Sequence, residues 1–171
     1  MIESSAILKS INIPSIVFPI SSMASGVINL LLSLIPFTIL MYFFGFQLGW
    51  VTLLVLPALV LFGLFTLGIC LFMCAINVYF RDIGILWSSL TPAMFYFTPI
   101  VYAPELVPEQ YRWALKFNPI YHFMEIFRDI LYYNQLPSGK ALAITGGLTV
   151  IALILGSWTF RKLERGFISN Y

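Results

Sequence analysis

The sequence predicts an all-α integral membrane protein with four transmembrane helices and a re-entrant extracytoplasmic helical hairpin between the third and fourth spans. Hydrophobic residues make up 60% of the 171-residue chain and charged residues only 9%, whereas a soluble domain carries about 25% charged residues. No charge occurs between Lys9 and Arg81, which leaves room for two spans. Residues 118–133 are apolar but shorter than the roughly 20 residues that a spanning helix needs, so this stretch indicates the hairpin.

Residues 1–19 precede the predicted spans and contain the charges Glu3 and Lys9. Apolar residues recur on one side of a short helix over residues 2–11, which Pro14 would end. A frayed terminus fits the same residues equally well. The residues alone therefore leave two alternatives for this segment.

The first two spans are predicted over residues 20–44 and 50–79, joined by a glycine-rich turn at residues 45–49. Pro36 and Pro57 lie inside them, which membrane helices tolerate when neighbouring groups satisfy the freed carbonyls. The second span also carries small residues that allow close helix packing, namely Ala58, Gly63, Gly68 and Ala75. Cys70 and Cys74 of this span are interpreted as packing residues, since one helical turn is the wrong geometry for a disulfide.

The third span is predicted over residues 83–102, where Pro92 and Pro99 are expected to bend it. Asp82 can cap this helix, and Arg81 can reach lipid phosphates or a carboxylate of a partner. The fourth span is predicted over residues 141–160, and a tail over residues 161–171 follows it.

The hairpin is predicted over residues 111–133. Asn118 is a good N-cap and Pro119 suits the first helical position, so a helix begins there. One face is apolar, comprising Ile120, Phe123, Phe127, Ile130 and Leu131; the other carries Tyr121, His122, Glu125, Arg128, Asp129 and Tyr132. Glu125 and Arg128 are three residues apart and can form an ion pair that holds or orients a gate. An amphipathic helix lying flat at the membrane surface is an equal alternative.

Basic residues near the ends of the spans predict the orientation. Arg161, Lys162 and Arg165 cluster at the C-terminal end, which is therefore placed in the cytoplasm. Four spans then place the N-terminus there too, and residues 118–133 on the outer side. The net charge of +2 and the absence of a basic run give no indication of nucleic-acid binding.

Five short motifs, in this order along the chain, resemble the membrane subunit of type 2 ABC exporters, which move O-antigen, capsule or teichoic acid. They are LKSINIP (8–14), NVYFRDI (77–83), TPIVY (98–102), NP with the following Glu125 and Arg128 (118–128), and FRKLERGF (160–167). The resemblance implies a plasma-membrane permease that moves a polysaccharide or polyol-phosphate polymer, expected to be lipid-linked. It also implies two partners, a nucleotide-binding subunit and a second copy of the permease.

The resemblance further implies two groups of functional residues. Contact with the ATPase subunit is expected at Leu8, Lys9, Ile11, Asn12, Pro14, Arg81 and Asp82. The outer gate and translocation path are expected at Pro99, Tyr102, Asn118, Pro119, His122, Glu125 and Arg128. The chain contains no phosphate-binding G-x-x-x-x-G-K-S/T motif, so ATP is expected on the separate subunit, with neither a cofactor nor enzymatic activity in this chain.

Members of this family carry an N-terminal interface helix and two further spans before the coupling segment, and this chain is expected to lack them. Two other functions remain open at this point. In an integral membrane glycosyl or acyl transferase, His122 and Glu125 would act as base and acid on the outer face. A truncated, non-transporting membrane scaffold is the second.

Overall fold

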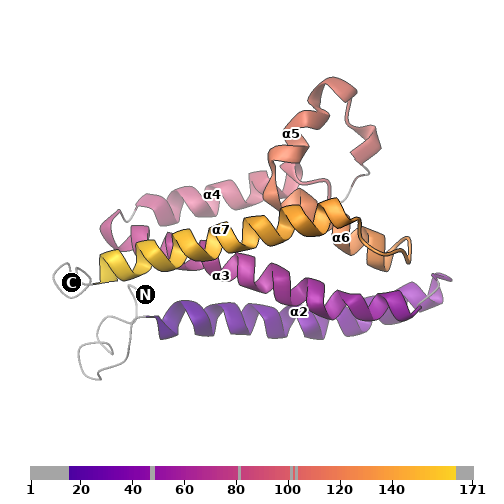
Figure 1. Cartoon of the computed structure of the whole chain (residues 1–171), viewed down its shortest axis with the longest axis horizontal. Helices are drawn as coiled ribbons and strands as arrows, with labels where there is room; N and C mark the ends of the chain where they lie inside the picture. The colour runs from indigo at the N-terminus through magenta and orange to yellow at the C-terminus, as the bar shows by residue number, and fades with distance from the viewer. Residues whose placement is uncertain (1–15, 47–48, 81, 101, 103, 165–171) are drawn as a thin grey trace.

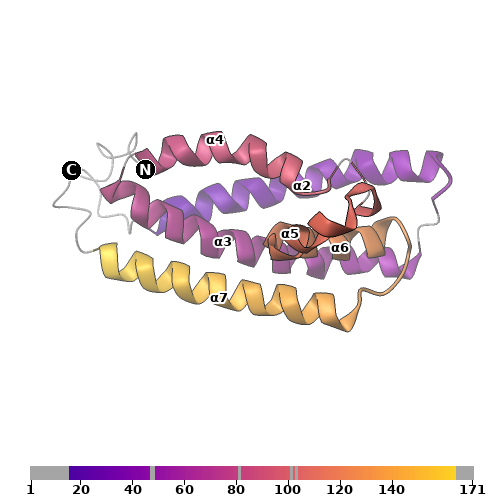
Figure 2. The same ribbon diagram turned by 90° about the horizontal axis from the view of Figure 1, so that it is seen from above.

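The computed structural model describes residues 16–46, 49–80, 82–100, 102 and 104–164, and within these ranges it contains helices and no strands. The elements are α2 (Val17–Phe43), η2 (Trp50–Leu54), α3 (Val55–Tyr79), α4 (Asp82–Phe97), η3 (Pro104–Leu106), η4 (Glu109–Tyr111), α5 (Arg112–Phe117), α6 (Pro119–Leu131) and α7 (Gly139–Glu164). Helices α2, α3, α4 and α7 follow the long axis of the molecule (Figure 1 and Figure 2), and α5 projects from its side (Figure 1). The predicted all-helical class is confirmed.

Three helices are long and apolar enough to cross a membrane, namely Val17–Phe43, Trp50–Tyr79 and Gly139–Leu163. They correspond to the first, second and fourth predicted spans, with somewhat shifted boundaries. The predicted turn after α2 includes Gly45, whose φ of 79° is a left-handed conformation that glycine adopts without a steric penalty. Thus glycine permits the reversal between α2 and η2.

The third predicted span is shorter in the structure than the sequence led us to expect. Helix α4 has 16 residues and ends at Phe97, so it rises about 24 Å where the hydrocarbon core measures about 30 Å. It ends before Thr98 because the residue preceding a proline is disfavoured in helical conformation. In both views α4 therefore ends part way along the bundle (Figure 1 and Figure 2).

Helices α3 and α7 approach so closely that their backbones touch, at a contact that we call the α3–α7 seam. A Cβ atom added at Gly68 would lie 2.6 Å from the carbonyl oxygen of Ala152, and one added at Gly156 would lie 2.9 Å from the carbonyl carbon of Gly68. Ala75 and Phe160, both 0% exposed, continue the seam. The close packing predicted from the small residues of the second span is thereby confirmed.

Helix α6 packs against α3 and α7. Its residues Phe123 and Ile130 are buried, and the Phe123 ring lies 5.3 Å and 4.9 Å from the rings of Phe62 and Phe65 on α3, measured between centroids. These two residues confirm the predicted apolar face. His122 is a correction, because it was assigned to the polar face and is also buried. The helix is thus anchored on one side by aromatic packing and carries its charges on the other.

Candidate functional site

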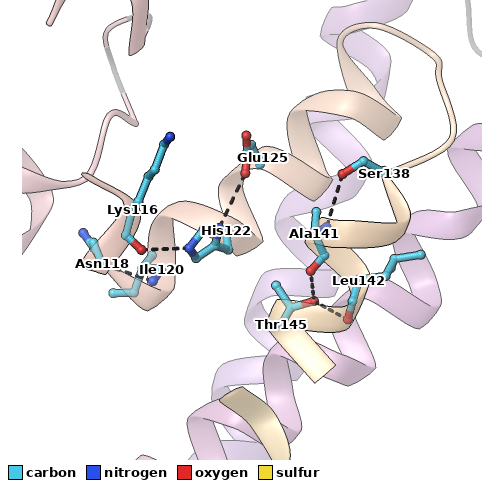
Figure 3. Close-up of polar contacts among 9 residues, drawn as sticks. All are labelled: Lys116, Asn118, Ile120, His122, Glu125, Ser138, Ala141, Leu142 and Thr145. Carbon is cyan, nitrogen blue, oxygen red and sulfur yellow. Dashed lines mark hydrogen bonds and ion pairs between the residues drawn. The ribbon is translucent and has the colours of Figure 1, made fainter. Parts of the chain in front are cut away.

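The candidate site lies where the end of α4 meets α6. Asn118 is the N-cap of α6, as predicted: its Oδ1 accepts a hydrogen bond of 3.0 Å from the Ile120 backbone N–H, and Pro119 follows as the first helical residue (Figure 3). The Nδ2 of the same side chain donates to Thr98 Oγ1 at 2.8 Å. One amide group therefore begins α6 and binds the end of α4.

The backbone at the end of α4 turns sharply around Pro99. The Thr98 N–H donates to the Met94 carbonyl at 2.9 Å, and the Ile100 N–H donates to the Thr98 carbonyl at 2.7 Å. Both Thr98 and Pro99 are buried, with Thr98 only 1% exposed. The Pro99 carbonyl accepts a hydrogen bond of 2.8 Å from Arg128 Nη2. The Pro99 carbonyl therefore receives its hydrogen bond from the Arg128 guanidinium of α6.

Glu125 and Arg128, which were predicted to pair with each other, each contact a different partner in the structure. Among the described side chains, no ion pair joins the two; Arg128 binds the Pro99 carbonyl, and Glu125 Oε2 lies 3.6 Å from His122 Nδ1. A hydrogen bond from a charged group to a buried carbonyl contributes about 1.5–3 kcal/mol, whereas a surface pair at this spacing contributes about 0.2–0.5 kcal/mol. The larger interaction therefore determines where the guanidinium lies.

His122 connects α6 to the end of α5. Its Nε2 lies 2.9 Å from the Lys116 carbonyl oxygen, and because a carbonyl only accepts, Nε2 is the protonated donor (Figure 3). Its Nδ1 is buried, has no hydrogen-bond partner among the described residues, and faces Glu125. The imidazole thus fixes the angle between α5 and α6 and leaves one nitrogen next to a carboxylate.

The remaining expected gate residue and a neighbouring carboxyl complete the polar surroundings. The Tyr102 hydroxyl donates to the Tyr96 carbonyl at 2.9 Å, so it also satisfies a carbonyl near the end of α4. Burial raises the pKa of the Asp129 carboxyl above its ordinary value, Glu125 raises it further, and Arg128 opposes both. All seven expected gate residues therefore lie along the α4–α5–α6 connection.

The residues expected to contact an ATPase subunit are mostly outside the described residues, namely Leu8, Lys9, Ile11, Asn12, Pro14 and Arg81. Asp82 is described; it is exposed and opens α4. Within the described ranges, no group of three or more His, Cys, Asp or Glu side chains could hold a metal ion.

Two residues that the sequence analysis gave no role are important in this geometry. Thr98 accepts the Asn118 hydrogen bond, and Asn77 Oδ1 accepts a hydrogen bond of 3.0 Å from the Gly84 N–H across the α3–α4 turn. A threonine directly before a proline at the end of an uncharged run is a usable signal for the first. Asn77 offers no comparable signal, because its partner is a backbone group on the next helix.

Comparison with known proteins gives consistent matches. The family model described as "ABC-2 type transporter" matches residues 8–132. The "O-antigen export system permease protein RfbA" of Klebsiella pneumoniae is 28% identical over 170 residues, which cover 97% of this chain and 64% of that protein. The protein of the same name from Myxococcus xanthus is 29% identical over 167 residues, covering 96% and 64%. The chain thus spans 64% of the length of these relatives.

Proposed function

Because the chain belongs to the ABC-2 type transporter family, we propose that it is the membrane-spanning subunit of an ATP-driven exporter of a polysaccharide or polyol-phosphate polymer. The observation that carries this proposal is the family match over residues 8–132. Relatives that cover nearly all of this chain are named as permeases of O-antigen export, which supports a lipid-linked surface polysaccharide as the substrate class.

ATP is bound and hydrolysed by a separate nucleotide-binding subunit that contacts the permease at its cytoplasmic end. The contact residues are Leu8, Lys9, Ile11, Asn12, Pro14, Arg81 and Asp82. Two features support transmission from this end: the Asn77–Gly84 hydrogen bond ties α3 to the first turn of α4, and the Tyr79 hydroxyl donates to the Leu163 carbonyl of α7 at 3.1 Å. A displacement at the α3–α4 turn would thus be carried by both α3 and α4.

The proposed topology has four spans, with α4 as the third and residues 111–133 as the re-entrant hairpin. The turns after α2 and after α6 are at the same end of the molecule, since the Phe46 and Tyr132 rings lie 5.0 Å apart (Figure 1). Helix α6 runs to that end from a level part way along the bundle. Arg161 and Lys162 in the last turn of α7 support a cytoplasmic position for the opposite end of the molecule. Both termini then lie on the cytoplasmic side of the plasma membrane.

A second copy of the chain completes the translocation path for the polymer. The described residues of α4 include no buried residue, and the helix is uncharged after Asp82, so it is available for contact with lipid or with a second permease. The outer gate comprises Pro99, Tyr102, Asn118, Pro119, His122, Glu125 and Arg128. Charged groups at membrane depth usually face a cavity, which supports a hydrated path beside this group.

The test is deletion of the gene in its own host, followed by measurement of surface polymer. Export predicts loss of surface polymer, accumulation of finished polymer inside the cell, and recovery when the gene is restored. A protein with a phosphate-binding loop should co-purify, and a variant of that loop should reproduce the deletion. Unfinished polymer would instead indicate a transferase, and unchanged surface polymer would refute the proposal.

A further inference from the structure

We propose that Asn118 and Arg128 form a two-point latch that holds the end of α4 on α6, and that this latch opens when the outer gate opens. The two points are the hydrogen bonds Asn118–Thr98 and Arg128–Pro99, each 2.8 Å long. This inference rests on the proposed function, because it assigns the moving contact within the gate. The residues act by positioning α4, without contact to the transported polymer being required.

The two residues that follow α4 are buried, whereas the helix itself has no buried residue. None of the residues from Asp82 to Phe97 is buried, whereas Thr98 is 1% exposed and Pro99 is fully buried immediately after the helix ends. The C-terminal end of α4 is thus held at α6, and its first turn is held at α3 by the Asn77–Gly84 hydrogen bond. Release of that end would free α4 to move as one body about the α3–α4 turn.

The Pro99 carbonyl lies just beyond α4, whose last residue is Phe97. A backbone carbonyl that is removed from water needs a hydrogen-bond partner. Arg128 satisfies the Pro99 carbonyl with a charged donor, and its positive charge also complements the negative end of the helix dipole. Because Arg128 lies on α6, 29 residues along the chain from Pro99, this hydrogen bond joins two segments and is lost if they separate.

Both points of the latch are needed to define one position of the end of α4. Asn118 lies at the first residue before α6, and Arg128 lies in its last turn. Hydrogen bonds at two separated points of α6 fix both the distance and the angle of the α4 end. Hydrogen bonds require a narrow range of distance and angle, so both must break before the end of α4 can leave α6.

The experiment uses cysteines at the first point of the latch. The two native cysteines, Cys70 and Cys74, are replaced by alanine, and Thr98→Cys and Asn118→Cys are introduced alone and together. In membranes that contain the whole exporter, a short, reducible bifunctional thiol reagent should link the pair rapidly without ATP. During ATP hydrolysis the linking should slow, because the two residues spend time apart.

Linked exporter should lose the polymer export that the same variant shows before linking and regain it after reduction. In each single-cysteine variant, the reagent should leave that variant's own export rate unchanged. An unchanged linking rate under ATP hydrolysis, or normal export by fully linked protein, would overturn the latch. The proposed function has a separate outcome: absence of export by the exporter with Thr98 and Asn118 intact would refute it, even where ATP still slows the linking of the cysteine pair.

The second point of the latch is tested by three variants of one residue. Arg128→Met removes the donor, and linking of the cysteine pair is expected to slow by roughly tenfold to a hundredfold, the factor that corresponds to one lost charge-assisted hydrogen bond. Arg128→Lys keeps a charged donor and should largely restore the rate. Arg128→Gln keeps a neutral donor and should lie between them. Equal rates in Met and Lys variants would contradict the role of the hydrogen bond.

Discussion

The α3–α7 seam and the α4–α6 junction are two helix contacts made in opposite ways. At the seam, Gly68 and Gly156 bring two backbones into direct contact, and the hydrogen bond from the Tyr79 hydroxyl to the Leu163 carbonyl lies further along the same two helices. At the junction, Asn118 and Arg128 reach across to the end of α4, and hydrogen bonds supply the contact. The difference shows how one membrane protein combines a rigid pair of helices with a contact that can separate. The predictions below test each side of this comparison.

The largest effect is expected from side chains introduced into the seam. Gly156→Val would place atoms on the Gly68 carbonyl, and backbone atoms cannot move aside as a side-chain end can. Overpacking in a well-packed core costs about 1–3 kcal/mol, and a backbone collision belongs at or above the top of that range. We expect little folded protein by size-exclusion chromatography.

Gly146 and Gly147 on the same helix provide the matched controls, because a Cβ atom at either position meets nothing within 4 Å. Gly146→Ala and Gly147→Ala should leave the yield unchanged or improve it, since alanine favours helix over glycine by about 1 kcal/mol. Equal losses at all three glycines would show that the seam is not specially close.

The next largest effect is expected at Thr98. Thr98→Val keeps the shape of the side chain and removes the acceptor for Asn118, which leaves the donor of a part-buried side chain unsatisfied at a cost of about 1–3 kcal/mol. Thr98→Ser retains the hydroxyl and should lose less. The free energy of unfolding in detergent micelles measures the difference.

Thr91 on α4 is the control for this change, since its hydroxyl donates only to the Trp87 carbonyl within its own helix and the residue is exposed. Thr91→Val should change the unfolding free energy by less than about 0.5 kcal/mol. If the junction does not depend on the Thr98 hydroxyl, Thr98→Val and Thr91→Val should change the unfolding free energy by the same small amount.

Variants of Asn118 separate the two roles of its side chain, the N-cap of α6 and the hydrogen bond to Thr98. Asn118→Asp keeps an oxygen for the N-cap and loses the donor to Thr98, while Asn118→Ala loses both. The free energy of unfolding of the alanine variant should be lower than that of the aspartate variant by about 0.5–2 kcal/mol, the usual contribution of an N-cap. If aspartate were as disruptive as alanine, the capping contribution to the junction would be negligible.

The smallest effect is expected at Asp129, whose pKa is raised by burial and by Glu125. A carboxyl with a higher pKa in the folded than in the unfolded protein destabilises the fold when ionised. This destabilisation is absent below the unfolded-state pKa and is complete above the folded-state pKa. Asp129→Asn should therefore raise the melting temperature slightly at neutral pH, and the gain should vanish in acid. A gain that grows towards acid pH would contradict the assigned direction.

The sequence was sufficient for the features that depend on local pattern. The spans in α2, α3 and α7 follow from uncharged apolar runs, the N-cap at Asn118 follows from residue type, and the close packing of α3 follows from its small residues. Each of these features depends on residues that are near one another in the chain or on one helix.

The features that the sequence did not reveal depend on distant backbone groups. The spacing of Glu125 and Arg128 suggested a pair, but the partner of Arg128 is a carbonyl 29 residues away, which no side-chain pattern marks. The early end of α4 has the same origin, since Pro99 was expected to bend the helix and instead follows its last turn. Likewise, His122 is buried because its donor reaches the Lys116 carbonyl on α5.

The most direct test of the account is a pair of distance measurements by electron paramagnetic resonance between spin labels in the assembled exporter. One pair, at the exposed residues Leu90 and Tyr132, reports the junction; the other, at the exposed residues Val60 and Val150, reports the seam. With ATP hydrolysis we expect the junction distance to lengthen or to become two distances, and the seam distance to stay the same. An unchanged junction distance, or a seam distance that changes as much, would contradict the account.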